Sequence, residues 1–227
     1  MSDARKVQKQ RRGPVVFIVD DDLSMRDALT DLFRSLKFDA EAFDSATAFL
    51  ETANFNRPGC ILLDVRLPGV SGLDFQRQLE RLGSKMPIVF MTGFGDISMG
   101  VQAMKAGAVD FLTKPFKDQD ILDAVAAAMK RDAAHRLESA QSEAAASLAG
   151  SLTPREREVM EAVVEGLMNK QIAYKLGISE VTVKQHRGNV MRKMKVRSVP
   201  ELVRKAEMLS NADDDHLYLS MISSKRP

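Results

Sequence analysis

The sequence has little cysteine and no long hydrophobic run. Cys60 is the single cysteine among 227 residues, so no internal disulfide framework can form, which fits a reducing, cytoplasmic location. The longest apolar run near the start, Val15–Val19, has five residues, too few for a signal-peptide core or a membrane span. A repeat of 20–50 residues is also absent. We therefore expect neither a secreted scaffold nor a membrane protein.

Charge divides the chain. Residues 14–131 hold 13 Lys and Arg against 17 Asp and Glu, a net −4, whereas residues 151–210 hold 12 against 7, a net +5. The segment between them is rich in Ala, Ser, Glu and Gln; its first part can continue a helix, and its second part is typical of a linker. We predict two domains with different partners. Their expected bounds are 14–131 and 151–210, with a helical extension and linker at 132–150 and disordered tails at 1–13 and 211–227.

The first half alternates short apolar runs with stretches of helical spacing. Gly and Pro mark the junctions, and this alternation is typical of βαβ units that form a parallel sheet covered on both faces. We predict an α/β fold: a flavodoxin-like, doubly wound, five-stranded parallel sheet. The expected strands are Val15–Val19, Ala40–Phe43, Cys60–Leu63, Ile88–Met91 and Val109–Leu112.

Polar residues follow the expected strands. Asp20, Asp21 and Asp22 come after the first strand, and Asp64 ends the third. Strand ends converge in such a sheet, and crowded carboxylates raise at least one pKa unless a cation relieves the repulsion. A hard divalent ion such as Mg²⁺ suits these ligands.

The fourth and fifth strands end in Thr92 and Lys114. Together with a metal, a hydroxyl and an ammonium make a phosphoryl site in which Asp64 is the nucleophile. Separate structural roles are the alternative: Asp20 or, above all, Asp22 as a helix cap, Thr92 as a turn residue and Lys114 as a solvated charge.

Residues 14–131 resemble the receiver domain of bacterial response regulators through the motifs "IVDDD", "LLDVRLPGVSG", "FMTGFGD" and "DFLTKPF". The resemblance implies that Asp64 accepts a phosphoryl group from the histidine of a sensor histidine kinase. It implies that Asp21, Asp64 and the Arg66 carbonyl ligate Mg²⁺, with Asp20 acting through water.

The same resemblance implies that Phe111 is the aromatic residue of the switch. In that family the peptide bond that corresponds to Lys114–Pro115 is often cis. An enzyme alternative is a haloacid-dehalogenase-like phosphatase, because "DDDLS" also fits its D-x-D-x-S/T loop with Asp20 as nucleophile. Against it, the domain has no obvious cap insertion.

The second half predicts a helix-turn-helix. Thr153 and Glu156 form a capping box around Pro154, and Gly166 ends that helix. Asn169 and Gly177 are the expected cap and stop of a short second helix, and Ser179 caps a third helix, "EVTVKQHRGNVMRKMKV".

The third helix has two faces by spacing. Val183, Val190 and Met194 should pack inward with His186, which we interpret as a core residue. The opposite face suits base contacts in the major groove of double-stranded DNA, and flanking residues suit phosphates. An ordinary solvated basic helix is the alternative. The expected base-contact face is Val181, Lys184, Gln185, Gly188 and Arg192, and the flanking residues are Thr182, Lys170, Arg187 and Lys193.

This half resembles the LuxR-type helix-turn-helix domain through "LTPREREV", "NKQIAYKLGIS" and "TVKQHRGNVMRKM", and the whole chain resembles the FixJ/NarL branch of response regulators. Gly188 is a departure, because members often carry a larger side chain there. The final helix, about Val199–Leu209, has an apolar stripe. The resemblance implies that this stripe forms the interface of a dimer, and packing in the core of a single chain is the alternative. Its residues are Leu202, Val203, Ala206 and Leu209.

The expected function is that of a transcription factor and not of an enzyme. Phosphorylation of Asp64 would draw Thr92 inward, Phe111 would follow, and the surface of about Asp96–Arg131 would pair two receivers into a DNA-binding homodimer. A constitutive DNA-binding regulator with a non-phosphorylated receiver is the alternative.

Overall fold

The computed structural model describes residues 13–54, 56–93 and 97–209. Contacts divide the chain into two compact units, the first ending at His135 and the second starting at Arg136. The tails expected at 1–13 and 211–227 lie outside the described residues, apart from Gly13. No described helix combines the length and apolar character needed to cross a membrane.

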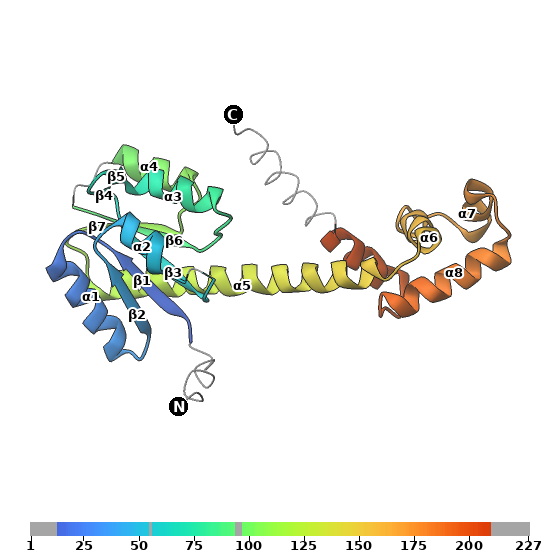
Figure 1. Ribbon diagram of the computed structural model, residues 1–227, viewed down its shortest axis with the longest axis horizontal. Coiled ribbons are helices and arrows are strands. Elements are labelled where there is room, and N and C mark those ends of the chain that lie inside the picture. Colours follow the sequence, from blue (N-terminus) through green and yellow to red (C-terminus); the bar gives the residue numbers. More distant parts are fainter. Residues whose placement is uncertain (1–12, 55, 94–96, 210–227) are drawn as a thin grey trace, which may run out of the picture. The chain divides into compact units, whose positions relative to one another are not determined.

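A five-stranded parallel sheet forms the centre of the first unit (Figure 1). In its order, β2-β1-β3-β6-β7, the first strand lies inside the sheet. The chain adds β2 on one side of β1 and the later strands on the other side, which confirms the doubly wound topology. Each expected strand is present, and each of its ends lies within one residue of the predicted position. The strands are β1 (Val15–Val19), β2 (Asp39–Phe43), β3 (Gly59–Asp64), β6 (Ile88–Thr92) and β7 (Asp110–Thr113).

Helices cover both faces of the sheet (Figure 1). On one face, Phe33 of α1 (Leu23–Ser35) and Val125 of α5 (Asp118–Gly150) pack against the side chains of Ile18 and Leu62. On the other, α2, α3 and α4 pack against the alternate residues of the same strands. Their bounds are Ala46–Thr52, Gly72–Arg81 and Ile97–Lys105.

A small antiparallel ribbon follows the third strand of the sequence. It pairs β4 (Arg66–Leu67) with β5 (Val70–Ser71) around Pro68 and Gly69, and Gly69 has a φ of 81°. The sequence indicated only a junction here, at Pro68 and Gly69, because two-residue strands are too short to show any alternation. The ribbon holds the backbone between Asp64 and α3.

The outer strand β2 carries a cluster of ion pairs. Arg57 donates to Glu41 at 2.7 Å and to Asp39 at 2.6 Å, and also to the carbonyl of Gly13 at 3.0 Å. One guanidinium thus joins the edge strand, the loop before β3 and the residues that lead into β1.

The segment expected to be a linker is helical. Helix α5 continues to Gly150, and its last part belongs to the second unit, where Ala145 and Ala149 are buried. Ser142 Oγ donates to the carbonyl of Met208 at 2.8 Å. Small alanines are good helix formers and let neighbouring helices approach closely, so a segment with few bulky apolar residues can still pack.

The second unit contains α6 (Pro154–Val164), α7 (Asn169–Leu176), α8 (Glu180–Lys193) and a helix over residues 199–209. The predicted capping box of Thr153 and Glu156 is confirmed, as is the left-handed stop at Gly177, with a φ of 66°. The third helix is shorter than expected and ends at Lys193, where the chain turns through Lys195 at a φ of 51°.

Candidate functional site

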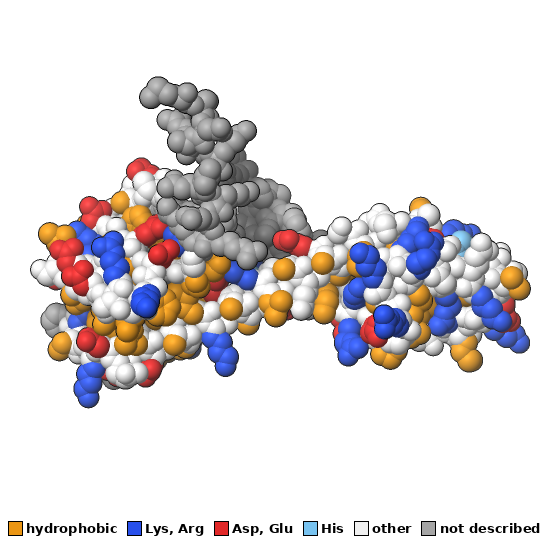
Figure 2. Space-filling view, turned by 90° about the horizontal axis from the view of Figure 1, so that it is seen from below, with side chains coloured by type: hydrophobic (Ala, Val, Ile, Leu, Met, Phe, Trp, Pro, Cys, Tyr) orange, Lys and Arg blue, Asp and Glu red, His pale blue; other side chains and the backbone are white. Residues whose placement is uncertain are grey.

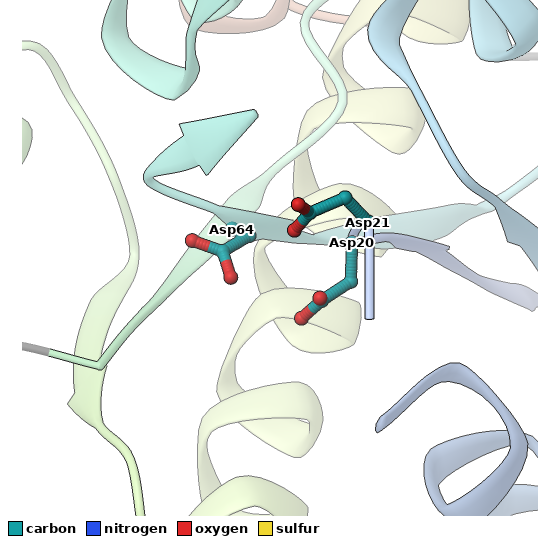
Figure 3. A group of neighbouring side chains, drawn as sticks. All are labelled: Asp20, Asp21 and Asp64. Carbon is teal, nitrogen blue, oxygen red and sulfur yellow. The ribbon is translucent and has the colours of Figure 1, made fainter. Parts of the chain in front are cut away.

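Three carboxylates meet at the carboxyl ends of two adjacent strands. Asp20 and Asp21 follow β1 and Asp64 ends β3, and each offers an oxygen that lies within 4.8 Å of the other two (Figure 3). Asp20 is fully buried and Asp64 is 8% exposed, whereas Asp21 is exposed. The sheet therefore brings together the acidic residues that the sequence predicted.

Lys114 lies between two of these carboxylates. Its Nζ donates to Asp20 Oδ2 at 2.6 Å and to Asp64 Oδ2 at 2.5 Å. Burial raises the pKa of Asp20 even though the Lys114 hydrogen bond opposes it. Burial acts to lower the pKa of Lys114, but hydrogen bonds to both carboxylates outweigh it and raise that pKa. The site is thus short of positive charge, because one ammonium is shared by two carboxylates.

Asp22 caps the first helix. Its Oδ1 accepts from the amide of Ser24 at 2.8 Å and of Met25 at 3.4 Å, so the capping interpretation of this residue is confirmed. The three consecutive aspartates therefore have different roles. Asp20 and Asp21 lie close to the Asp64 carboxylate, whereas Asp22 caps α1.

Thr92 and Arg66 lie beside Asp64. Met91 is the register partner of Asp64 on β6, so Thr92, which is 1% exposed, stands one residue beyond it at the same sheet edge. The amide of Arg66 donates to Asp64 Oδ1 at 2.8 Å. The Lys114–Pro115 peptide bond is cis, as the resemblance implied.

Two glycines near the site have a packing role that the sequence did not reveal. A Cβ at Gly72 would lie 2.6 Å from the carbonyl oxygen of Asp64, and one at Gly100 would lie 3.2 Å from the ring of Phe111. Gly72 therefore permits close backbone approach beside Asp64. Phe111 is half-buried and packs toward α4, where residue 100 has no side chain to oppose its ring.

Arg26 is a further residue that sequence reasoning missed. Its Nη1 donates to the carbonyl of Asp20 at 2.7 Å and holds the turn between β1 and α1. Only the helical spacing from Asp22 to Arg26 hinted that it would face back toward the turn.

The residues present fit a magnesium ion. Three carboxylates within mutual reach supply hard, anionic oxygens, and one of them is exposed, so an ion can enter with some of its waters. The raised pKa of Asp20 marks a deficit of positive charge that a divalent cation would relieve.

The second candidate site is the surface of α8. Ser179 caps this helix by accepting from the amide of Thr182 at 3.1 Å. Val183, Val190 and Met194 are buried, which confirms the predicted inward face. The residues proposed to contact bases are all exposed, and Figure 2 shows Lys and Arg side chains gathered on the surface of this unit. They are Val181, Lys184, Gln185, Gly188 and Arg192.

The flanking residues differ in what already holds them. Lys170 is exposed, and Thr182 Oγ1 lies 2.9 Å from Ser179 Oγ. Arg187 donates to Asn169 Oδ1 at 2.7 Å. Lys193 Nζ donates to Glu156 Oε2 at 2.5 Å and to the carbonyl of Ser151 at 3.0 Å, so its ammonium is bound within the unit.

Two expectations for this unit need revision. Met168, not Asn169, is the N-cap of α7, because the Gln171 side chain accepts from the Met168 amide at 2.8 Å while Asn169 turns to Arg187. His186 is only half-buried, although its Nδ1 is covered and has no hydrogen-bond partner.

The apolar stripe of the last helix is divided between core and surface. Leu202 is 1% exposed and belongs to the core of the unit, and Leu209 packs against that core. Val203 and Ala206 are half-buried. The core alternative thus accounts for Leu202 within a single chain.

Comparisons with known proteins match both halves of the chain. The family "Response regulator receiver domain" matches residues 16–126, and "Bacterial regulatory proteins, luxR family" matches residues 150–206. Nodulation protein W of Bradyrhizobium diazoefficiens is 52% identical over 86% of each chain. Transcriptional regulatory protein FixJ of Azorhizobium caulinodans is 47% identical over 88% of this chain and 95% of its own.

A solved structure of the response regulator StyR is also similar. It is 48% identical, covers 86% of this chain and 98% of its own, and has a TM-score of 0.75. The receiver-domain match and the regulators FixJ and StyR set aside the phosphatase alternative with Asp20 as nucleophile. The chain therefore belongs to the two-component response regulators of the FixJ type, transcription factors that join a receiver domain to a LuxR-type DNA-binding domain.

Proposed function

We propose that the protein accepts a phosphoryl group on Asp64 from a phosphohistidine of a sensor histidine kinase. An oxygen of Asp64 attacks phosphorus, the P–N bond breaks, and the kinase imidazole leaves with the electron pair of that bond. The observation that supports this best is the position of Asp64: at the end of a central strand, hydrogen-bonded to Lys114, and within reach of two further carboxylates.

The chain's own residues would share the charge of the transferred group. Lys114 Nζ already lies 2.5 Å from Asp64 Oδ2, so it can also donate to an oxygen of a phosphoryl group on Asp64. The Thr92 hydroxyl can donate to another phosphoryl oxygen. Asp21, Asp64 and the Arg66 carbonyl would hold Mg²⁺, with Asp20 acting through water, and the ion would supply neutralisation of the phosphoryl oxygens.

The output is sequence-specific binding to double-stranded DNA. The exposed face of α8 would enter the major groove, with Lys184 and Gln185 reading base edges and Val181 meeting a thymine methyl. Lys170, Thr182 and Arg187 would contact phosphates. Lys193 is already bound to Glu156 and Ser151, so we assign it to the packing of α8 on α6.

The link between the two sites is a two-state receiver. Thr92 would move toward the phosphoryl group, and the Phe111 ring would follow; because it has no hydroxyl, its effect is steric. The surface over about 96–131, of which residue 96 lies outside the described part, would then pair two receivers and bring two DNA-binding domains to two half-sites. Val203, Ala206 and Leu209 would support a homodimer at the last helix, leaving Leu202 to the core.

Intact mass after incubation with acetyl phosphate and Mg²⁺ tests the proposal. We expect the mass of one added phosphoryl group on the wild-type chain, none on Asp64→Ala, and an undiminished gain on Asp22→Asn, because Asn caps a helix as well as Asp does. An unchanged gain on Asp64→Ala would refute the assignment. DNA binding that is the same with and without the phosphodonor would favour the constitutive regulator.

A further inference from the structure

One hydrogen bond ties the start of α7 to the middle of α8. Arg187 Nη1 donates to Asn169 Oδ1 at 2.7 Å, and the two residues are 18 positions apart in the sequence. Both side chains are half-buried. Because α7 and α8 are the two helices of the helix-turn-helix, this bond crosses the motif itself.

Asn169 does not serve the local role that its residue type favours. Asn at a helix start normally caps the helix through its side chain, and loss of such a cap destabilises the helix. Here Met168 is the N-cap, and it makes no side-chain hydrogen bond to the first turn. The Asn169 carboxamide is directed at Arg187 instead, so the start of α7 does not explain its position.

The partner of Arg187 is neutral, unlike those of two nearby cations. Lys193 is bound by Glu156 and Lys175 by Glu165, whereas no carboxylate in the described part of this unit forms an ion pair with Arg187. A guanidinium has five donors, and an amide oxygen takes one without cancelling the charge. The remaining donors match the bidentate geometry of a phosphate.

The position of Arg187 on α8 suits a contact at the edge of the DNA-binding face. Its neighbours Lys184 and Gly188 are exposed, and Val183, four residues before it, is fully buried. Residue 187 therefore lies where the exposed face of the helix meets the face packed on α7. An arginine at such a boundary needs support to keep its long side chain in one place.

We propose that Asn169 is a positioning residue that holds the Arg187 guanidinium for one DNA phosphate. The inference rests on the proposed DNA binding and adds a residue that touches neither base nor phosphate through its own side chain. The neutral carboxamide fixes the guanidinium, lowers the entropy lost on binding, and leaves the positive charge available.

Salt-dependent binding of the full-length chain to mixed-sequence duplex DNA tests this without knowledge of the operator, because phosphate contacts dominate non-specific binding. We expect Arg187→Ala to lower affinity roughly tenfold and to reduce the slope of log affinity against log salt by about 0.9. Asn169→Ala should lower affinity roughly threefold, and the double variant should match Arg187→Ala alone, since the two residues act together.

Asn169→Asp separates positioning from a structural role. A carboxylate at the first residue of α7 favours the helix dipole and binds Arg187 more strongly, so thermal stability should hold or rise. Affinity for DNA and the salt slope should nevertheless fall below those of Asn169→Ala, because the guanidinium charge is now neutralised. Lys175→Ala is the matched control, and we expect no change in slope from it, since Lys175 is bound to Glu165.

Failure of the proposed DNA binding and failure of the role of Asn169 give different results. If the wild-type chain fails to bind duplex DNA, the proposed function fails. If it binds, and Asn169→Asp binds DNA as tightly as the wild type with the same salt slope, Asn169 only joins two helices and the inference is wrong.

Discussion

Each unit contains a lysine whose ammonium holds a buried carboxylate, and the two arrangements have opposite consequences. Lys193 serves one carboxylate, Glu156, which also accepts from the amide of Thr153, and the Lys193 hydrogen bond followed by this backbone bond lowers the pKa of Glu156 to about 2. Lys114 serves two, Asp20 and Asp64, and burial leaves the pKa of Asp20 raised.

The comparison shows that a short lysine–carboxylate distance does not by itself indicate a stabilised pair. What matters is how many charges share the cation and how many donors surround each carboxylate. The Glu156 pair satisfies both partners and fixes α8 on α6. The Asp20 site retains excess negative charge, which is what the proposed metal-dependent phosphoryl transfer would require.

Removal of Lys114 should have the largest effect. Lys114→Ala leaves two buried carboxylates facing each other, so we expect a loss of about 3 kcal/mol in the free energy of unfolding of the first unit without Mg²⁺. Added Mg²⁺ should recover more stability in this variant than in the wild type, because it replaces the missing charge. Urea unfolding, monitored through the amide exchange of β1 and β3, measures the free energy of unfolding with and without Mg²⁺. Lys117→Ala, an exposed lysine in the same loop, is the control, and equal losses in both variants would contradict the account.

Loss of the Glu156 charge should have the next largest effect. The folded pKa of about 2 lies below the ordinary 4.5, so this carboxylate stabilises the fold above pH 4.5, and the contribution disappears as the pH falls toward 2. Glu156→Gln should lower stability at neutral pH by about 1–2 kcal/mol and flatten the acid dependence of α8 amide signals in NMR spectra. Glu158→Gln, which loses an exposed pair with Arg155, should keep the wild-type acid dependence. Identical acid curves for Glu156→Gln and wild type would exclude the pair as a source of stability.

The smallest effect should have the opposite sign. A folded pKa raised above the ordinary 3.8 means that ionised Asp20 opposes folding, and the penalty is relieved as the pH falls through the folded pKa. Asp20→Asn should therefore raise the stability of the first unit at neutral pH, without Mg²⁺, by less than the Glu156→Gln change lowers that of the second, and it should reduce the extra stability that Mg²⁺ gives. Asp27→Asn, on an exposed face of α1, controls for net charge. A destabilised Asp20→Asn chain would show that the buried charge is satisfied after all.

Most of the fold could be predicted because its signals are local. Val15–Val19 is a continuous apolar run ending in carboxylates, and Thr153, Pro154 and Glu156 spell out a helix start within four positions. The ribbon at Arg66–Ser71 was not predicted, and neither was the helical course of the second part of the Ala-rich segment, which was expected to be a linker. The first has too few residues for a pattern, and the second packs through small alanines that resemble linker composition.

The sites divide in the same way. Asp64, Thr92 and Lys114 could be placed together because a parallel sheet gathers strand ends whatever the rest of the chain does. Contacts between residues that are distant in sequence and do not follow neighbouring strands could not be predicted. Lys193 binds Glu156, which lies 37 positions earlier in the sequence. The sequence around neither residue indicates that the two will form a pair.

The salt-bridged edge strand β2 has a consequence for the protein at high concentration. Asp39 and Glu41 alternate along a strand that has a neighbouring strand on one side only among the described residues, and Arg57 forms an ion pair with both carboxylates. A foreign strand that approached this edge would have to bury or displace those charges. We therefore expect β2 to resist the edge-to-edge pairing that leads to fibrous aggregation.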